Sequence, residues 1–178
     1  MALTIQQIRD ASSDEDLLRL LQTELNLLFP PESRRDVPVF LSKLQTVPAG
    51  LRAMAATFEL DVSMALDDLA WHFVNYPHLD WYEETLQGLR ELEVGEAAEL
   101  FEKAFAIVEP HWDKMGEVAK DEKFGAIHDW LNATGLQKQI DPLDDQMRKL
   151  LDQWPETGLM HYWMVYARKY PARCVQTN

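Results

Sequence analysis

Pairs of histidine and carboxylate are the residues of this sequence whose types and spacing come closest to chemistry. A neutral imidazole beside a carboxylate can act as a general base or as a metal ligand. Four of the five histidines have such a neighbour within four residues. The pairs are Asp68 with His72, His78 with Asp80, His111 with Asp113, and His128 with Asp129.

Metal-binding helices need a stricter spacing than these pairs have. Two ligands one helical turn apart, as in Glu-x-x-His or His-Glu-x-x-His, point at a single ion. The sequence contains neither pattern. The residues three positions before the histidines are Leu69, Asn75, Val108, Gly125 and Gly158. We therefore expect no metal site and no cofactor.

Motifs for nucleophilic or nucleotide chemistry are also missing from the sequence. There is no Gly-x-Ser-x-Gly, no Gly-x-Gly-x-x-Gly and no glycine-rich phosphate loop. We therefore name no catalytic residue, and a protein other than an enzyme is favoured. The alternative is a small metal-dependent or His/Asp hydrolase. It would need a pocket joining His72, His78 and Asp80, or His128 and Asp129.

The elements that would position these residues are helices. Apolar residues recur at helical spacing through most of the chain, and most clearly in residues 96–110. Valine and isoleucine are scarce and Asn-Gly dipeptides are absent, so strands are not expected. With 47% hydrophobic residues, a chain of 178 residues can bury a core. We predict a single all-α domain, residues 1–178, of about eight to ten helices.

Capping residues predict where several of these helices begin. A short polar side chain before an apolar stripe accepts hydrogen bonds from the first free N–H groups of a helix. The helix that starts near residue 61 would continue to Pro77, since proline ends a helix. The predicted starting positions are Ser12 with Glu15, Asp61, Asp80 with Glu83, and Asp141 with Pro142.

A concentration of aromatic residues on both sides of Pro77 predicts a structural corner between two helices. Rings at the end of one helix and at the start of the next pack together and fix the angle between them. An asparagine near the helix end can bond exposed backbone groups. We favour this structural role over a ligand pocket. The residues of the corner are Trp71, Phe73, Asn75, Tyr76 and Trp81.

The net charge of the protein is concentrated in one part of the chain. Residues 59–122 contain seventeen acidic and four basic residues, and they account for the whole formal net charge of −13. Such a segment repels nucleic acid and anionic membranes, and it attracts basic surfaces. We therefore expect a basic protein partner and no direct nucleic-acid or membrane binding. The other explanation is that the charge only maintains solubility.

Part of this segment resembles the bacterial DNA-mimic protein family, an all-α family also catalogued as a domain of unknown function. The similarity covers about residues 69–108. Its elements are a helix ending in Phe-Phe-x-Asn, a helix with an "ETL" motif, and a helix rich in alanine and acidic residues. In this sequence His72 replaces one aromatic residue of the first element. The matching residues are Phe73 and Asn75, then Glu84, Thr85, Leu86 and Leu89, and then Leu92, Gly95, Ala97 and Ala98.

The resemblance implies a negatively charged helical protein that occupies the DNA-binding surface of a basic partner. Charge spacing supports the same idea independently. Duplex DNA carries one charge per about 1.7 Å of axis, and side chains three or four positions apart on a helix are about 5–6 Å apart. The predicted acidic rows are Glu96, Glu99 and Glu102; Glu83, Glu84 and Glu91; and Asp113, Glu117, Asp121 and Glu122.

A third class of function remains open, in which binding does not depend on charge. An immunity or adaptor protein would use an apolar and aromatic patch. Candidates for that patch are Trp112, Trp130, Trp154 and Trp163.

Cysteine content and the lack of targeting segments predict the cell compartment. The single cysteine, Cys174, cannot form an internal disulfide. The first residues lack a signal-peptide or transit pattern, and no apolar run is long enough to span a membrane. We expect a cytoplasmic protein, and a homodimer is compatible with the sequence.

Overall fold

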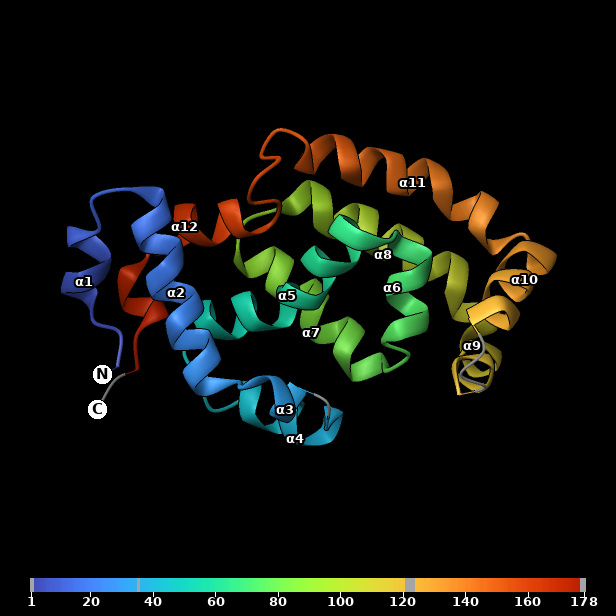
Figure 1. The fold of residues 1–178 in the computed structure, drawn as a ribbon, viewed down its shortest axis with the longest axis horizontal. Coiled ribbons are helices and arrows are strands. Elements are labelled where there is room, and N and C mark those ends of the chain that lie inside the picture. Colours follow the sequence, from blue (N-terminus) through green and yellow to red (C-terminus); the bar gives the residue numbers. More distant parts are fainter. Residues whose placement is uncertain (1, 35, 121–123, 177–178) are drawn as a thin grey trace.

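All regular elements in the described part of the chain are helices. The computed structural model describes residues 2–34, 36–120 and 124–176. Its arrangement confirms the predicted all-α class (Figure 1). The α-helices are α1 (Ile5–Asp10), α2 (Asp14–Leu28), α3 (Pro31–Arg34), α4 (Val37–Leu44), α5 (Ala49–Leu66), α6 (Leu69–Asn75), α7 (Leu79–Glu91), α8 (Gly95–Val108), α9 (Trp112–Ala119), α10 (Phe124–Thr134), α11 (Leu136–Leu151) and α12 (Met160–Lys169), and the 3-10 helices are η1 (Glu109–His111) and η2 (Pro171–Cys174).

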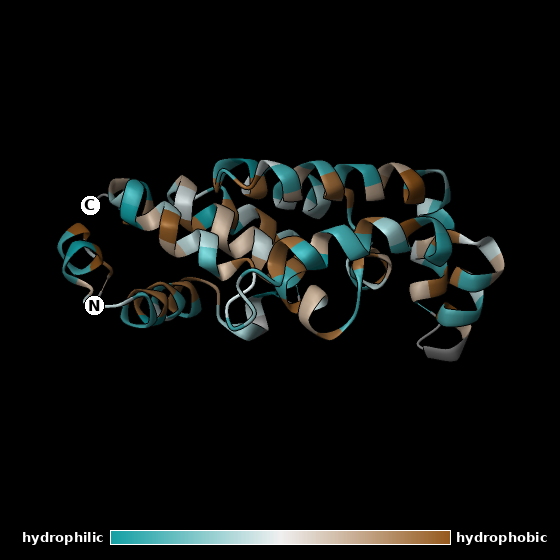
Figure 2. Ribbon diagram, turned by 90° about the horizontal axis from the view of Figure 1, so that it is seen from above, coloured by the Kyte–Doolittle hydropathy of each residue, from teal (hydrophilic) through white to brown (hydrophobic). Residues whose placement is uncertain are grey.

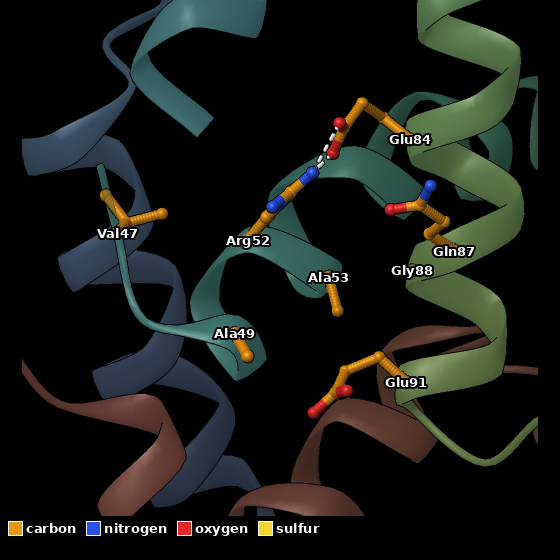
Figure 3. Close-up of a pocket in the computed structure, with 8 residues that line it drawn as sticks. All are labelled: Val47, Ala49, Arg52, Ala53, Glu84, Gln87, Gly88 and Glu91. Atoms are coloured by element: carbon orange, nitrogen blue, oxygen red, sulfur yellow. Dashed lines mark hydrogen bonds and ion pairs between the residues drawn. The ribbon is translucent and has the colours of Figure 1, made fainter. Parts of the chain in front are cut away.

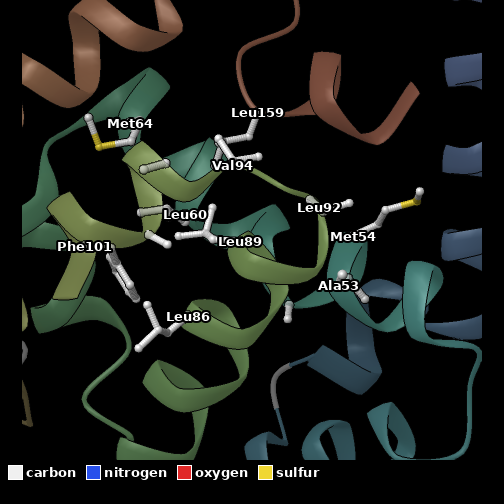
Figure 4. Packing of buried hydrophobic residues seen from close by; sticks show 14 of the residues in the cluster. Ala53, Met54, Leu60, Met64, Leu86, Leu89, Leu92, Val94, Phe101 and Leu159 are labelled. Atoms are coloured by element: carbon white, nitrogen blue, oxygen red, sulfur yellow. The ribbon is translucent and has the colours of Figure 1, made fainter. Parts of the chain in front are cut away.

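Helix α5 lies at the centre of the fold, and its largest interface is with α7. The two helices approach closely because α7 carries Gly88 at their contact. A Cβ atom at Gly88 would come within 3.0 Å of the Ala53 carbonyl oxygen. Figure 4 shows apolar side chains from both helices, among them Leu60 and Leu89, filling the space around this contact. The α5–α7 pair is therefore the fixed centre on which other helices pack.

Helix α8 packs against α7 on one side and against α11 on another. Its apolar residues are buried, including Ala97, Phe101 and Phe105, as the sequence periodicity predicted. Figure 1 shows α11 running along the outside of α8. In Figure 2 hydrophilic and hydrophobic segments alternate along the helices, as expected where one side faces a core. The acidic residues of α8 consequently remain on the surface.

The N-terminal helices pack on elements from the other end of the chain. Helix α2 contacts α12, and α1 contacts η2, so that the two termini lie on the same side of the molecule (Figure 1). Helix α4 covers part of α7, where Phe40 stacks on Trp81 with ring centroids 4.8 Å apart. This cover keeps Trp81 only 1% exposed.

The predicted helix from Asp61 to Pro77 is wrong, because two helices occupy this stretch. Helix α5 continues through Asp61 to Leu66. Helix α6 begins after the N-cap residue Asp68, whose carboxylate accepts a hydrogen bond from the Trp71 N–H at 2.9 Å. Asp68 therefore has the capping role that the sequence analysis gave to Asp61.

Side chains of α11 stabilise the break between α5 and α6. Asp144, which is 7% exposed, accepts a hydrogen bond from the Leu69 N–H at 3.0 Å. Arg148 donates to the Met64 carbonyl oxygen at 3.0 Å and to the Asp67 carbonyl oxygen. Asp144 and Arg148 also form an ion pair at 2.7 Å. These groups satisfy backbone N–H and C=O groups that the ends of two helices leave unpaired.

The substitution Asp144→Ala is expected to lower the free energy of unfolding by about 2–3 kcal/mol, because it leaves buried donors without an acceptor. Urea unfolding followed by circular dichroism measures the change. The control is Asp145→Ala at the exposed neighbouring position, which is expected to change stability by about 0.5 kcal/mol or less. Equal losses in the two variants would contradict the role given to Asp144.

Two predicted helix starts are displaced by one or two residues. The N-cap of α2 is Ser13 rather than Ser12, and its hydroxyl accepts from the Asp16 N–H at 3.1 Å. Helix α7 begins after His78, so Asp80 lies in its first turn. An acidic residue there still interacts favourably with the helix dipole.

The predicted start at Asp141 is also wrong. Helix α11 begins at Leu136, and Pro142 lies inside it. Gly135 separates α10 from α11 with a φ of 70°, a left-handed conformation that glycine adopts without strain. The chain therefore turns between the two helices at Gly135 and leaves no loop before Asp141.

Asp61 fastens the segment between α11 and α12 to α5. Its carboxylate oxygen Oδ1 accepts a hydrogen bond from the Leu159 N–H at 2.6 Å. Gly158, with a φ of 50°, passes so close that a Cβ atom there would lie 2.4 Å from the same oxygen. Asp61 is 8% exposed, and burial raises its pKa to about 6, although the Leu159 hydrogen bond opposes the shift. Ionised Asp61 therefore costs folding free energy at neutral pH.

Because the folded-state pKa is raised, the stabilisation from a protonated Asp61 is complete below about pH 3.8 and is lost as the pH rises through about 6. The substitution Asp61→Asn keeps an oxygen for Leu159 without the charge. It is expected to raise the free energy of unfolding by about 2–3 kcal/mol at pH 7.5, an advantage that disappears in acid.

Denaturant unfolding of both proteins across this pH range tests the prediction. Burial lowers the pKa of His72 to about 3, which has the opposite effect on stability in acid. The difference between the two proteins cancels that contribution. A difference that does not change with pH would mean that Asp61 has no raised pKa.

Candidate functional site

The first acidic row predicted from the sequence lies on the exposed side of α8. Glu96, Glu99 and Glu102 are all exposed, because the apolar residues of α8 face α7 and α11. Glu99 has a salt bridge to Lys103 at 3.7 Å, and Glu102 has one to Arg90 at 3.1 Å. Ion pairs this exposed contribute little and exchange with other partners. The row is therefore accessible to a basic ligand.

Negative charges on α7, α8 and η1 act on the Tyr82 side chain. Burial raises the pKa of Tyr82, and the negative charges of Glu102, Glu109 and Glu83 raise it further, while Arg90 opposes them. The elements that carry these charges contact one another, because α8 packs against α7 and continues into η1. The sequence analysis placed Glu83 and Glu102 in separate rows, whereas the structure places them on two adjacent helices that the Arg90–Glu102 salt bridge joins.

An aromatic cluster supports this surface from below. Tyr82 stacks on Phe105 with centroids 3.6 Å apart and planes at 14°. Phe105 also meets Trp112 edge-to-face at 5.2 Å. Such contacts hold α7, α8 and the start of α9 in fixed positions. We call Glu83, Glu96, Glu99, Glu102 and Glu109 the acidic surface.

Glu109 is the member of this surface that the sequence analysis missed. It follows Glu102 by seven residues, which is two helical turns, so the row on α8 continues into η1. Extending the row two helical turns beyond Glu102, to the residue just before Pro110, would have identified it.

The second predicted row does not form one exposed line, because two of its members face inward. Glu84 is 9% exposed and accepts two hydrogen bonds from Arg52, at 2.7 and 2.6 Å, and a third from Gln45 at 2.8 Å. Glu91 is half-buried and accepts from the Tyr166 hydroxyl. It also pairs with Arg173 at 2.8 Å. Each of these carboxylates is therefore paired with an arginine of the protein, Glu84 with Arg52 and Glu91 with Arg173.

Glu84 and Glu91 line a cavity of about 200 Å³ between α5 and α7 (Figure 3). The floor of the cavity contains Ala53 and Gly88, the residues of the close helix contact. The Arg52–Glu84 pair crosses one side of it (Figure 3). The Arg52–Glu84 pair therefore connects α5 to α7. Glu83 is the one exposed carboxylate of the second predicted row.

The third predicted row is only partly within the described residues. Asp113 and Glu117 are exposed on α9, and Glu117 pairs with Lys114 at 2.8 Å. Asp121 and Glu122 lie outside the described residues.

The residues of the predicted aromatic corner lie on both sides of Pro77, at the end of α6 and the start of α7. Tyr76 and Trp81 face each other across Pro77, with centroids 5.0 Å apart. Phe73 stacks on Phe101 at 5.2 Å, and Trp71 is partly buried against the core. Asn75 is exposed and borders a surface cavity with His78. The Tyr76 hydroxyl donates to Glu59 at 2.7 Å, which anchors the corner to α5.

The histidines that a hydrolase would use lie in different environments. His72 is 2% exposed and contacts the Ser63 hydroxyl at 3.0 Å inside the core. His78 and Asp80 are exposed, as are His128 and Asp129. Among the described residues, no group of three histidine, cysteine, aspartate or glutamate side chains is arranged to hold a metal ion.

The tryptophans proposed for an adaptor patch are largely covered. Trp163 is fully buried and donates its indole N–H to Thr57 at 3.1 Å. Trp112 and Trp130 are partly buried against the core, and only Trp154 of these four is exposed, at 38%.

Fold and surface together define an acidic all-α protein whose charged surface lies over α7, α8 and η1. A family model described as DMP19-like protein matches residues 45–169. This match covers well over half of the chain, so the protein belongs to the DMP19-like family, the family of DNA mimic protein 19. Searches of curated proteins and of solved structures gave no match.

Within the described residues, no helix is both long and apolar enough to cross a membrane.

The adjacent residues Glu83 and Glu84 should differ sharply in their effect on stability. The substitution Glu84→Gln removes the charge that Arg52 binds, and a lowering of the unfolding free energy by about 1–2 kcal/mol is expected. Glu83→Gln changes an exposed side chain and should have an effect of about 0.5 kcal/mol or less. Thermal and urea unfolding of the two variants measure this. If Glu83→Gln were the more destabilising change, the assignment of inner and outer carboxylates would be wrong.

Proposed function

We propose that the acidic surface binds the DNA-binding surface of a basic protein and excludes DNA from it. The observation that carries this proposal is the exposed row of Glu96, Glu99 and Glu102 on α8. Glu83 on α7 and Glu109 on η1 are also exposed, and both elements contact α8. Membership of the DMP19-like family supports the same function.

The spacing of the charges suits a surface that normally binds phosphates. Glu96, Glu99 and Glu102 follow one another at three-residue intervals on α8, so neighbouring carboxylates are about 5–6 Å apart at the helix surface. Lysine and arginine side chains that contact successive phosphates of a DNA strand can meet such a row. Glu83 and Glu109 widen the row into a patch.

The rigid support beneath the charges favours binding. The carboxylates are on helices that the Tyr82–Phe105–Trp112 cluster holds together. Less conformational entropy is lost on association when the binding groups are already in place. Their attraction for a basic partner is long-range and mainly raises the association rate, so binding should weaken as salt is added.

A charge-neutralising variant tests the proposal. The triple substitution Glu83→Gln, Glu102→Gln and Glu109→Gln preserves side-chain size and removes three negative charges. The control, Glu15→Gln, Asp129→Asn and Asp145→Asn, removes three exposed charges outside residues 59–122. Immobilised wild-type and variant proteins are incubated with extract of the native cell, and bound protein is eluted with duplex DNA or with salt.

The wild type and the control are expected to retain a basic protein that duplex DNA elutes, and the purified partner should associate with the acidic-surface variant about tenfold more slowly. Surface plasmon resonance with that partner gives the rates. An equal fall in the association rate for both triple variants would show that binding depends only on the total charge and not on the acidic surface. A partner that resists both salt and DNA would exclude DNA mimicry and favour an adaptor role.

A further inference from the structure

A second cavity lies away from the acidic surface, beneath the segment that joins α11 to α12. Its volume is about 220 Å³. Met64, Leu151 and Met160 supply apolar walls, and Trp154 contributes an exposed indole. Asp61 of α5 is the most deeply buried charged residue in its lining.

Asp61 has an unused carboxylate oxygen in this cavity. Oδ1 accepts from the Leu159 N–H, while Oδ2 has no hydrogen-bond partner among the described residues. Among the described residues, the Trp81 indole nitrogen is the only side-chain nitrogen or oxygen that has neither a hydrogen-bond partner nor contact with solvent. Oδ2 of Asp61 is therefore in contact with solvent. The free oxygen is therefore open to the cavity, and the residue as a whole is 8% exposed.

Among the residues that the structure describes, none forms a salt bridge with Asp61. Arg148 lines the same cavity, but it donates to Asp144 and to the Met64 and Asp67 carbonyl oxygens. Its charge is consequently paired with Asp144. The remaining charged residues of the lining, Asp152 and Glu156, are themselves negative and exposed.

The chemistry of the lining selects an organic cation over a metal ion. Asp61, Asp152 and Glu156 all line the cavity, but among the described residues no three such side chains are arranged to hold a metal ion. Beside Asp61 the walls supply the thioether and alkyl groups of Met64, Leu151 and Met160. An indole attracts a cation to its ring face. One face of Trp154 is stacked on His161, with ring centroids 3.4 Å apart. Burial lowers the pKa of His161, although Asp14 opposes this, so His161 is neutral at pH 7 and does not repel a cation.

We propose that this cavity binds a primary alkylammonium group, with the ammonium on Asp61 Oδ2 and the alkyl chain between Met64, Leu151 and Trp154. The ammonium replaces the solvation that the buried carboxylate has lost. The same group occurs in free alkylamines and in lysine side chains. The proposal does not depend on the function of the acidic surface, because no residue of that surface lines the cavity.

Isothermal titration calorimetry of the full chain with n-butylammonium chloride at pH 7.5 tests the proposal. We expect saturable binding with one site per chain. Asp61→Asn, which is expected to fold, should weaken binding by at least about tenfold, because the ion pair is lost. Asp152→Asn on the exposed rim is the matched control and should change affinity by about twofold or less. n-Butanol, which has the same shape without charge, should bind far more weakly.

The pH dependence of binding provides a second measurement. Burial raises the pKa of Asp61 to about 6, so at pH 5 about nine-tenths of the carboxyl is protonated and affinity should fall about tenfold. Bound butylammonium should in turn lower the pKa of Asp61, seen in the carboxyl carbon resonance by NMR. Arg148, Asp152 and Glu156 line the same cavity, and His161 stacks on Trp154. These groups are present in the wild type and in Asp61→Asn, so a change of affinity with pH that the wild type shows and Asp61→Asn lacks belongs to Asp61.

The peptide acetyl-Gly-Gly-Lys-Gly-Gly-amide separates the two sources of the ligand. Binding of butylammonium together with the peptide assigns the cavity to a lysine side chain, and binding of butylammonium alone assigns it to a free amine. Binding that Asp61→Asn retains, equal binding of butanol, or no saturable binding of either amine would overturn the proposal.

Discussion

The close packing of α5 against α7 is the constraint on which the surface chemistry of this protein depends. Gly88 allows the α7 backbone to approach Ala53, and this contact fixes the rotation of α7 about its own axis. With that rotation set, Glu84 faces Arg52 in the interior and Glu83 faces solvent. Two carboxylates that are neighbours in the sequence therefore have different roles, because successive helical positions point about 100° apart.

The inward-facing carboxylates Glu84 and Glu91 and the exposed carboxylate Glu83 lie on the same helix, α7, so the contacts of the first two also fix the position of the third. The Arg52–Glu84 pair and the Tyr166–Glu91 hydrogen bond attach α7 to α5 and α12. A helix anchored at two points can carry uncompensated charge on its outer side, since repulsion among exposed carboxylates costs little in water. The aromatic contacts of Tyr82 and Phe105 extend this rigid support to α8. The exposed negative charge thus lies on helices that several side-chain contacts hold together.

Much of the fold could be predicted from the sequence, because the apolar residues that recur at helical spacing are the residues that a folded helix buries. The α8 stripe of Ala97, Phe101 and Phe105 could be predicted, since the helix must bury that side. Helix boundaries were less predictable where tertiary groups supply the caps. The break at Asp67 and Asp68 is stabilised by Asp144 and Arg148, about eighty residues away in the chain, and no local pattern contains that information.

The candidate site was predictable in composition but not in geometry. Net charge located the acidic segment and the row on α8, but it could not show that Glu84 is buried or that Glu109 joins Glu102 near Tyr82. Those facts depend on the rotation and crossing of helices. Asp61 is a similar case, because its sequence neighbours resemble a helix cap while the Leu159 segment buries it.

The two uses of negative charge in this protein differ in their physical basis. Carboxylates of the acidic surface stay hydrated, so each contributes a weak attraction that salt screens, and a partner is recognised by the sum of many such contributions. Asp61 has lost most of its hydration, so its single charge interacts strongly with whatever reaches it and is little affected by salt. A distributed surface therefore suits a large basic macromolecule, whereas one buried carboxylate beside an indole suits a single ammonium group. Because α5 carries Asp61 at one end and contacts α7 along its length, both kinds of negative charge are built on the same central helix pair.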